Sequence, residues 1–313
     1  MNSVKIWLIV AVVLIAVGIL LVAVTIGGKR IEYETVTHDV SGSFERISVE
    51  AETADVAFLP SEDGRCRVVF YEHPESRHFA EVRDGTLTVG KADGRKWYNV
   101  LFSFGSRQTV TVYLPKASYQ GLFVSESTGN VTIPADFCFG DIDIDVSTGD
   151  VTLCAGATGT VKVEATTGDI VLSDVCAESM TLSVSTGRIT VEKAACAGDV
   201  LVNATTGNIV LTDVTCRSLT SEGSTGDLTM TDVVAAEHFL IERNTGDVHF
   251  AECDAADISV ETTTGDVRGT LLSDKYFTAK STTGNIGVPE PNGTGKCSLT
   301  TTTGDIQITV KSK

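Results

Sequence analysis

The side chains most able to do chemistry in this chain are carboxylates that recur at a constant spacing. A tetrapeptide of Ser, Thr or Asn, then Thr, then Gly, then usually Asp or Asn, recurs from residue 127, and its ten glycines lie 19 or 20 residues apart. The glycines are Gly129, Gly149, Gly168, Gly187, Gly207, Gly226, Gly246, Gly265, Gly284 and Gly304. If successive repeats stack, Asp227, Asp247 and Asp266 lie about 5 Å apart, and Ca²⁺ binds clusters of oxygen ligands.

A structural role for these acids is the interpretation we favour. Arg188 holds the same place in one repeat and Asn208 in the next, although neither is a carboxylate. Asp or Asn beside glycine can hydrogen-bond the local backbone and so close a sharp turn. The sequence therefore predicts no cofactor and no metal, with Asp227, Asp247 and Asp266 kept as calcium candidates.

Eight cysteines occur without a Cys-x-x-Cys pair, which argues against a zinc knuckle. Cys176, Cys196 and Cys216 follow successive glycines at eight or nine residues, so we expect them to stack on neighbouring coils. Small buried thiols are the commoner case, and the spacing does not forbid a disulfide. The five histidines show no pairing with a nucleophile, and we predict no catalytic residues.

An aromatic segment at residues 95–104 interrupts the second quarter of the chain. Its candidate partner-contact residues are Trp97, Tyr98, Phe102 and Phe104, beside Arg95 and Lys96. Aromatic and basic side chains together are typical of binding hot spots. The alternative, which we favour, is that Trp97 and Phe102 close the end of a hydrophobic core.

Alternation around each glycine shows which elements carry these residues. The second residue after every glycine is aliphatic, and the residues between the apolar positions are mostly polar, as in Val151-Thr152-Leu153. Alternation with period two predicts strands buried on one face. Each unit is thus strand, Thr-Gly-Asp corner, strand and a looser turn such as residues 173–178.

A unit this short cannot bury its own apolar face, so neighbouring units must stack. The repeats carry no helical periodicity, and odd and even units do not differ as propeller blades would. The sequence predicts an all-β parallel β-solenoid (β-helix), one 19–20-residue unit per coil. We expect the last coil, which ends Lys311-Ser312-Lys313, to form the C-terminal edge, where lysines discourage strand pairing.

The N-terminal residues predict a membrane anchor. From Ile6 to Ile26 no residue is charged, and 21 residues in a helix span roughly 30 Å, the thickness of a bilayer core. We predict a cytoplasmic N-terminus at 1–5, one transmembrane helix at 6–26 and a linker at 27–40. A strand-rich N-terminal region or cap at 41–125 and the regular solenoid at 126–313 follow. This makes a single-pass protein of the cell membrane, with its soluble domain placed outside the cell.

Composition excludes one class of partner. The chain of 313 residues carries 24 basic and 41 acidic side chains and a formal charge of −17. Nucleic-acid affinity comes largely from basic side chains that displace counterions. We therefore expect no nucleic-acid partner.

The N-terminal span, the strand-rich region and the serial Ser/Thr-Thr-Gly-Asp-Val units resemble the bacterial DUF4097 family, whose members are labelled adhesins. The resemblance covers residues from about 40 to 310. It implies a right-handed β-solenoid on a bacterial envelope and supplies no catalytic residues. We expect a non-enzymatic adhesin or interaction scaffold whose partner is an unknown protein or a cell-wall polymer. The alternatives are an envelope-stress accessory protein that binds another membrane protein and a polysaccharide-active β-helix enzyme.

Overall fold

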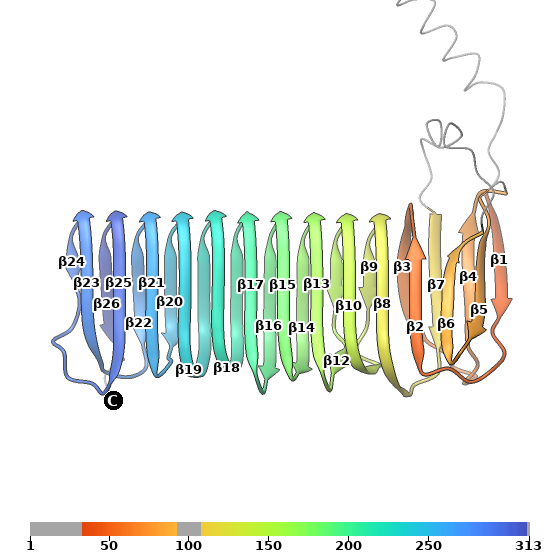
Figure 1. Ribbon diagram of the computed structural model, residues 1–313, viewed down its shortest axis with the longest axis horizontal. Helices are drawn as coiled ribbons and strands as arrows, with labels where there is room; N and C mark the ends of the chain where they lie inside the picture. Colours follow the sequence, from red (N-terminus) through yellow and green to blue (C-terminus); the bar gives the residue numbers. More distant parts are fainter. Residues whose placement is uncertain (1–32, 75, 93–107, 312–313) are drawn as a thin grey trace, which may run out of the picture.

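The computed structural model describes residues 33–74, 76–92 and 108–311, which form one long stack of β-strands (Figure 1). These ranges hold no helix, and hence none that is long and apolar enough to cross a bilayer. The predicted span from Ile6 to Ile26 lies outside the described residues.

Each regular coil has two arms that meet at the Thr-Gly-Asp corner. The strands before the corners are β8 (Ser118–Thr128), β10 (Cys138–Thr148), β13 (Thr160–Thr167), β15 (Ser179–Thr186), β17 (Asp199–Thr206) and β21 (Asp257–Thr264). The strands after the corners are β9 (Val131–Ile133), β11 (Val151–Leu153), β14 (Ile170–Ala177), β16 (Ile189–Cys196), β20 (Val248–Cys253) and β22 (Val267–Leu271). Two longer strands, β18 (Ile209–Thr225) and β19 (Leu228–Thr245), run from the second arm of one coil into the first arm of the next, and β12 (Gly156–Ala157) lies beside β10.

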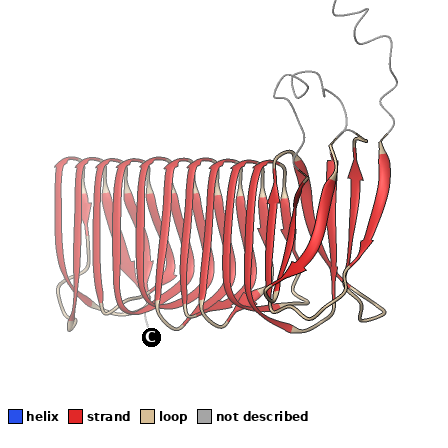
Figure 2. Cartoon of the chain, turned by 45° about the vertical axis from the view of Figure 1, so that its right-hand side comes forward, coloured by secondary structure: helices blue, strands red, loops and turns tan. Residues whose placement is uncertain are grey.

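Neighbouring coils pair in parallel and in register, so equivalent residues stack. Ile144 of β10 pairs with Val163 of β13, and Ile189 of β16 pairs with Ile209 of β18. The apolar residues of both arms point inward and form one continuous core. The predicted β-solenoid of stacked coils is therefore confirmed (Figure 2).

Glycine is required at the corner for two reasons. Nine of the ten corner glycines have φ between 130° and 156°, a region that other residues rarely adopt. In addition, a Cβ on Gly187 would overlap the carbonyl oxygen of Gly168 in the neighbouring coil. The Gly168 N–H donates to the carbonyl of Thr186 at 3.0 Å, which holds these two coils at this close approach.

A second bend lies six residues after the corner glycine in five consecutive coils. Its residues have φ of 54–56° and are Asp174, Lys193, Asp213, Asp232 and Glu252. None of them is buried. The sequence predicts a looser turn here, whereas β14, β16, β18, β19 and β20 continue through the bend.

The N-terminal end of the stack consists of coils placed out of sequence order and then closed. The strands are β1 (Glu34–Asp39), β2 (Arg46–Ala51), β3 (Ala54–Pro60), β4 (Arg67–Glu72), β5 (His78–Arg83), β6 (Thr86–Lys91) and β7 (Gln108–Leu114). The coil of β2 and β3 lies against β8 and β9, and the coil of β6 and β7 lies outside it. Beyond them β5 pairs with β6, and β4 and β1 follow β7, all antiparallel.

The C-terminal end is also out of order. Its strands are β23 (Lys275–Thr283), β24 (Ile286–Gly287), β25 (Gly295–Thr303) and β26 (Ile306–Val310). Strand β25 pairs with both β21 and β23, and β26 pairs with both β22 and β24. The last coil of the chain is thus inserted between the two coils that precede it.

The prediction that the last coil forms the C-terminal edge is therefore wrong. The inserted coil points Leu299, Ile306 and Ile308 into the core, and each is at most 3% exposed. The coil of β23 and β24 offers less apolar surface and takes the end, where Ile286 is 48% exposed. The coil with more apolar surface takes the place where both of its neighbours can cover it.

Candidate functional site

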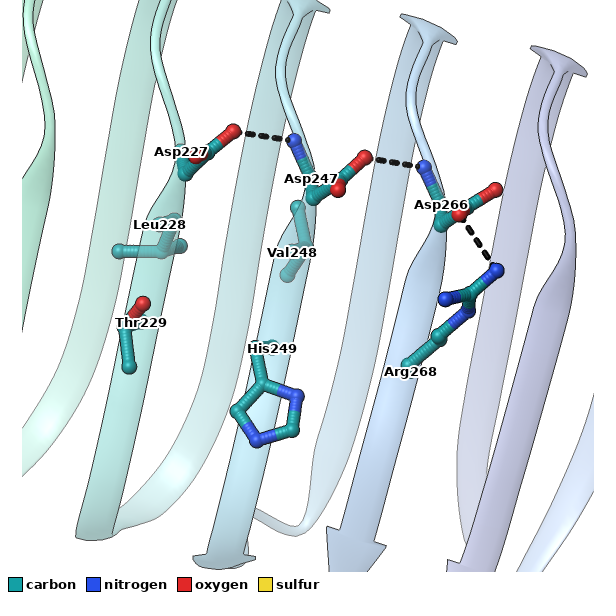
Figure 3. Close-up of a pocket in the computed structure, with 8 residues that line it drawn as sticks. All are labelled: Asp227, Leu228, Thr229, Asp247, Val248, His249, Asp266 and Arg268. Carbon is teal, nitrogen blue, oxygen red and sulfur yellow. Dashed lines mark hydrogen bonds and ion pairs between the residues drawn. The ribbon is translucent and has the colours of Figure 1, made fainter.

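The corner acids form a hydrogen-bonded column along one edge of the stack. Oδ1 of Asp227 accepts the backbone N–H of Asp247 at 2.9 Å, and Oδ1 of Asp247 accepts that of Asp266 at 2.8 Å (Figure 3). In the same way Asp55 binds Asn130, Asn130 binds Asp150, and Asp150 binds Asp169. Each side chain thus holds the backbone of the next coil.

Arg188 marks the place where this column changes. The Arg188 N–H donates to Oδ1 of Asp169 at 2.8 Å, but an arginine side chain has no acceptor to pass to the next coil. The column starts again at Asn208, whose Oδ1 accepts the N–H of Asp227. Asn does this as well as Asp because only an acceptor oxygen is needed, which supports the structural interpretation.

The three calcium candidates lie together in a shallow groove of about 280 Å³ on the second-arm side of the corner. Oδ2 of Asp266 is bound by Arg268 at 2.6 Å, and Arg268 also reaches Asp305 at 3.5 Å. Asp227, Asp247 and His249 also line this groove (Figure 3). Within the described ranges no three His, Cys, Asp or Glu side chains converge as a metal site would require.

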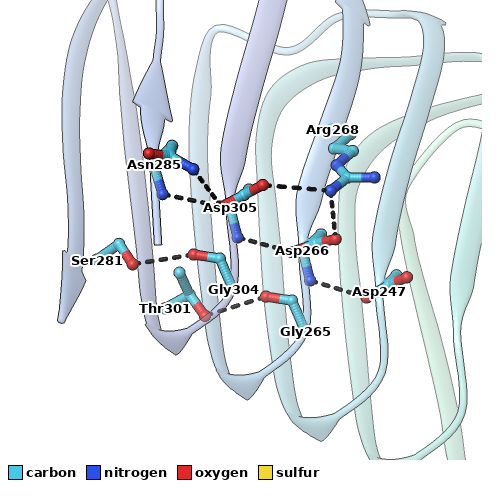
Figure 4. Close-up of polar contacts among 9 residues, drawn as sticks. All are labelled: Asp247, Gly265, Asp266, Arg268, Ser281, Asn285, Thr301, Gly304 and Asp305. Carbon is cyan, nitrogen blue, oxygen red and sulfur yellow. Dashed lines mark hydrogen bonds and ion pairs between the residues drawn. The ribbon is translucent and has the colours of Figure 1, made fainter. Parts of the chain in front are cut away.

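The C-terminal corners add hydroxyl groups to this column (Figure 4). Thr301 Oγ1 donates to the carbonyl of Gly265 at 3.0 Å, and Ser281 Oγ donates to that of Gly304 at 2.9 Å. Asp305 accepts from the backbone of Asn285, so the inserted coil is bound through its corner to the coil on each side. The corner therefore serves to hold coils together.

The aromatic candidates cannot be placed in the fold. Trp97, Tyr98, Phe102 and Phe104 lie outside the described residues, in the connection between β6 and β7. The two strands that it joins form one coil, because β6 pairs with β2 and β7 pairs with β3. Both interpretations of this segment stay predictions.

The buried cysteines are thiols without the properties of nucleophiles. The eight are free, and Cys196 and Cys216 lie side by side on neighbouring coils, both buried. Burial raises the pKa of Cys196 to about 11 and that of Cys216 to about 12, which keeps both protonated at neutral pH. Cys176 pairs with Ala195 instead and is exposed, so it does not share their column.

Sequence reasoning missed several buried ionisable groups. Glu72 and His78 form a buried pair at 2.7 Å in the N-terminal cap. Glu126 lies 2% exposed and accepts the N–H groups of Ala54 and Thr128, and burial raises its pKa to about 7. Arg243 is 3% exposed. Aligning the repeats would have revealed Glu126 and Arg243, because both stand three residues before a corner glycine, where most coils have a small or aliphatic residue.

A second, polar groove of about 390 Å³ lies on the outer face of the first arms. Stacked carboxylates of Glu222, Glu242 and Glu261 line it, each in register with the next. Gly223 and Arg243 also line this groove. Both grooves are open depressions of a regular surface. Their polar side chains are suited to contact with a partner at the surface.

Comparison with known proteins agrees with this architecture. The sequence model of the family described as Toastrack DUF4097 matches residues 44–200 and 188–313. No functionally curated protein matches the chain.

Three solved structures are similar at low identity. A "putative adhesin" from Bacteroides fragilis is 14% identical, with 90% of this chain and 98% of that one covered, at a TM-score of 0.41. A "putative lipid binding protein" from Parabacteroides distasonis is 17% identical, with 76% and 96% covered, at 0.44. A "putative adhesin" from Parabacteroides distasonis is 12% identical, with 88% and 97% covered, at 0.44. Likenesses this distant carry no information on function.

Proposed function

Since this chain belongs to the Toastrack DUF4097 family, we propose that it is a non-enzymatic, membrane-anchored scaffold of the cell surface that binds a partner through the side of its rod. The partner is another protein or a cell-wall polymer. The proposal includes the single span at residues 6–26, the right-handed winding that the family implies, and a stack that lies outside the cell.

One observation carries this proposal, namely the uninterrupted period of the coils. Ten corners recur at 19 or 20 residues, and the corner hydrogen bonds repeat along the described stack. An enzyme on such a fold needs long loops that wall a cleft over several coils. The two grooves described above are open instead, and the aspartates of the corner are engaged in holding the stack.

The outer face of the first arms is the contact surface that the geometry favours. It combines the stacked carboxylates of Glu222, Glu242 and Glu261 with hydroxyl and amide side chains of neighbouring positions. In-register parallel pairing repeats these groups from one coil to the next, so a long partner can make the same contact several times. Repeated weak contacts raise the overall affinity through effective concentration.

The experiment is a crosslinking pull-down with the full-length chain in its own membrane. Protease added to intact cells should cleave the rod if it lies outside the cell. The yield of crosslinked partner should depend on the side chains of the first-arm face. The triple variant E222Q/E242Q/E261Q is expected to weaken capture, whereas Glu192→Gln, on the second arm, should leave it unchanged.

Two results would contradict the proposal. Cleavage of a polysaccharide by the purified chain would show an enzyme. Protection of the rod from protease in intact cells would place it inside. Capture of only another protein of the same membrane, with no wall polymer or cell retained, would favour the envelope-stress alternative.

A further inference from the structure

Two columns of exposed side chains lie next to each other on the outer face of the first arms. Glu222, Glu242 and Glu261 stack in register on β18, β19 and β21 and form a glutamate column. Leu201 and Leu240 lie in the neighbouring column, two coils apart, and form a leucine pair. The face therefore carries an acidic column beside an apolar one.

The glutamate column has no counter-charge of its own. Elsewhere on the same face, Nζ of Lys162 lies 2.7 Å from Glu164 and 3.9 Å from Asp143, so the chain itself supplies a cation there. Within the described ranges no basic side chain forms an ion pair with the glutamate column, and Arg243 is buried and donates to Ser221 instead. Like charges directly opposite each other destabilise a sheet. A partner that brings cations to this column relieves that repulsion.

The leucine pair adds apolar surface at the same place. Leu201 is 38% exposed and Leu240 is 37% exposed, whereas the inward-facing Leu182 and Leu219 are fully buried. A single exposed leucine is ordinary on a protein surface. These two lie beside the glutamate column, so one partner can cover the apolar surface and pair with the carboxylates at once.

The stacking of the coils fixes the spacing of both columns. Neighbouring strands lie about 4.8 Å apart, so the two-coil step from Glu222 to Glu261, like that from Leu201 to Leu240, spans about 9.6 Å along the rod. In an α-helix laid along the rod, residues i and i+7 are about 10.5 Å apart on one face, with i+3 or i+4 between them. An extended segment repeats on one face every 6.7 Å or so and falls out of step with the coils. A helix therefore matches the columns better.

We infer that this face binds a basic amphipathic α-helix of a partner protein, which lies along the rod across β17, β18, β19 and β21. Lys or Arg side chains at i, i+3 or i+4, and i+7 pair with the glutamate column, and an adjoining apolar stripe covers the leucine pair. The inference rests on the proposed function, since it names the partner of the contact surface described there. It selects a protein over an anionic wall polymer, because the same carboxylates repel a polyanion.

The test uses the full-length chain in nanodiscs of zwitterionic lipid and two synthetic peptides of identical composition. In the first peptide, Lys and Leu recur at helical spacing in adjoining stripes, and in the second they alternate with period two. A short peptide has little helix in water, so circular dichroism of helix that appears on mixing reports binding of the first. We expect the first peptide to bind roughly tenfold more tightly than the second, with an affinity that falls as salt is added. Empty nanodiscs give the background.

E222Q/E242Q/E261Q should weaken binding of the first peptide roughly tenfold, because it removes several exposed ion pairs at once. D213N/D232N/E252Q is the matched control, since it removes the same charge from exposed positions of the second bend, and it should leave binding unchanged.

The apolar contact is tested separately from the charge. L201S/L240S should weaken binding about fivefold without any change of net charge, because it removes apolar surface that the helix covers. Val234→Ser is its control, since Val234 is also 38% exposed but lies on the second-arm side, and it should leave binding unchanged.

Equal affinity of the two peptides would overturn the helix in favour of an extended partner. Binding that is unchanged in E222Q/E242Q/E261Q, or a lysine-only peptide that binds as tightly as the first, would overturn the inference as well. These outcomes are distinct from failure of the proposed function. Capture in cells that depends on the glutamate column, without binding of the first peptide, would leave the contact surface standing and overturn only the helix.

Discussion

The two bends of each coil differ in what they tolerate. The corner carries glycine at every repeat, with φ between 130° and 156° at nine of ten positions, whereas the second bend carries Asp, Lys or Glu at φ of 54–56°. At the corner, a Cβ on Gly187 would overlap the next coil. At the second bend, the side chain of Lys193 lies in solvent.

The two bends therefore use different backbone conformations, since φ of 54–56° is left-handed and φ of 130–156° is not. Non-glycine residues can occupy the left-handed region at a modest cost. The corner needs glycine because its φ lies outside that left-handed region and because two backbones approach each other there. The adjoining Asp or Asn then bonds the next coil. The recurring motif of the sequence is the place where coils touch most closely.

The largest loss of stability is expected from a substitution of the corner glycine. Gly187→Ala puts a Cβ into the carbonyl oxygen of Gly168 and should destabilise the chain by about 3 kcal/mol or more, measured by urea unfolding. Gly42→Ala is the control, since Gly42 also lies outside the left-handed region, at φ of 111°, but an added Cβ would meet no atom closer than 3.6 Å. An equal loss in both variants would contradict the close-approach explanation.

The next effect concerns the first regular corner, where Glu126 accepts two backbone N–H groups. Burial raises the pKa of Glu126 to about 7, well above its value of about 4.3 in an unfolded chain. The folded chain therefore holds the carboxyl proton of Glu126 more tightly than the unfolded chain does. The stabilisation that this proton contributes is complete below about pH 4 and is lost as pH rises through 7.

Between pH 5 and pH 8 this group should remove about 2–3 kcal/mol of unfolding free energy. Glu126→Gln should flatten the profile over that window, whereas Glu50→Gln, at an exposed position of β2, should leave it as it is. A pH profile that is the same in Glu126→Gln as in the unchanged chain would show that the carboxyl does not titrate in this range.

A smaller effect separates the acceptor from the charge in the corner column. Asp247→Ala removes the acceptor for the N–H of Asp266 and should cost about 1 kcal/mol. Asp247→Asn keeps the acceptor and should cost less than about 0.5 kcal/mol. Removing divalent cations with EDTA and then adding millimolar Ca²⁺ should leave Tm unchanged, and a calcium shift lost in Asp247→Asn would restore the metal interpretation.

The smallest effect has the opposite sign and concerns the second bend. Lys193→Gly should stabilise the chain by about 0.5–1 kcal/mol, because glycine adopts φ of 54° without strain. Lys162→Gly, in the extended part of β13, should destabilise it. Chemical unfolding of both variants gives the comparison, and a loss in Lys193→Gly would mean that the bend is not strained.

Much of the fold follows from the sequence because each repeat contains both the residues of the turn and the residues of the buried face. The glycine spacing gives the length of the coil, and the aliphatic residue two positions later gives the buried face, as Val151 and Ile170 show. The structural role of the corner acids also follows, since Arg188 and Asn208 could not both belong to a metal site.

The order of the coils could not be predicted from the same pattern. Every unit presents similar edges, so nothing local tells the coil at Gly284 from the coil at Gly304. The choice depends on the difference in apolar surface between whole coils, as with Ile306, which is buried, and Ile286, which is not. A buried charge such as Arg243 is not found by a search for periodic apolar residues, because it departs from the pattern at a single inward position.

The inserted coil at residues 295–310 has a consequence for synthesis. Strands β25 and β26 leave the ribosome after β23 and β24, yet they belong inside the stack. Until they arrive, the coil of β23 and β24 has no partner with which to pair, because its hydrogen bonds are made to β25 and β26. A chain that stops before Gly295 thus loses an interior layer, and its preceding coil is left detached. Synthesis of residues 295–310 therefore completes the pairing at this end of the stack, and a copy that lacks them exposes unpaired strands that proteases can recognise.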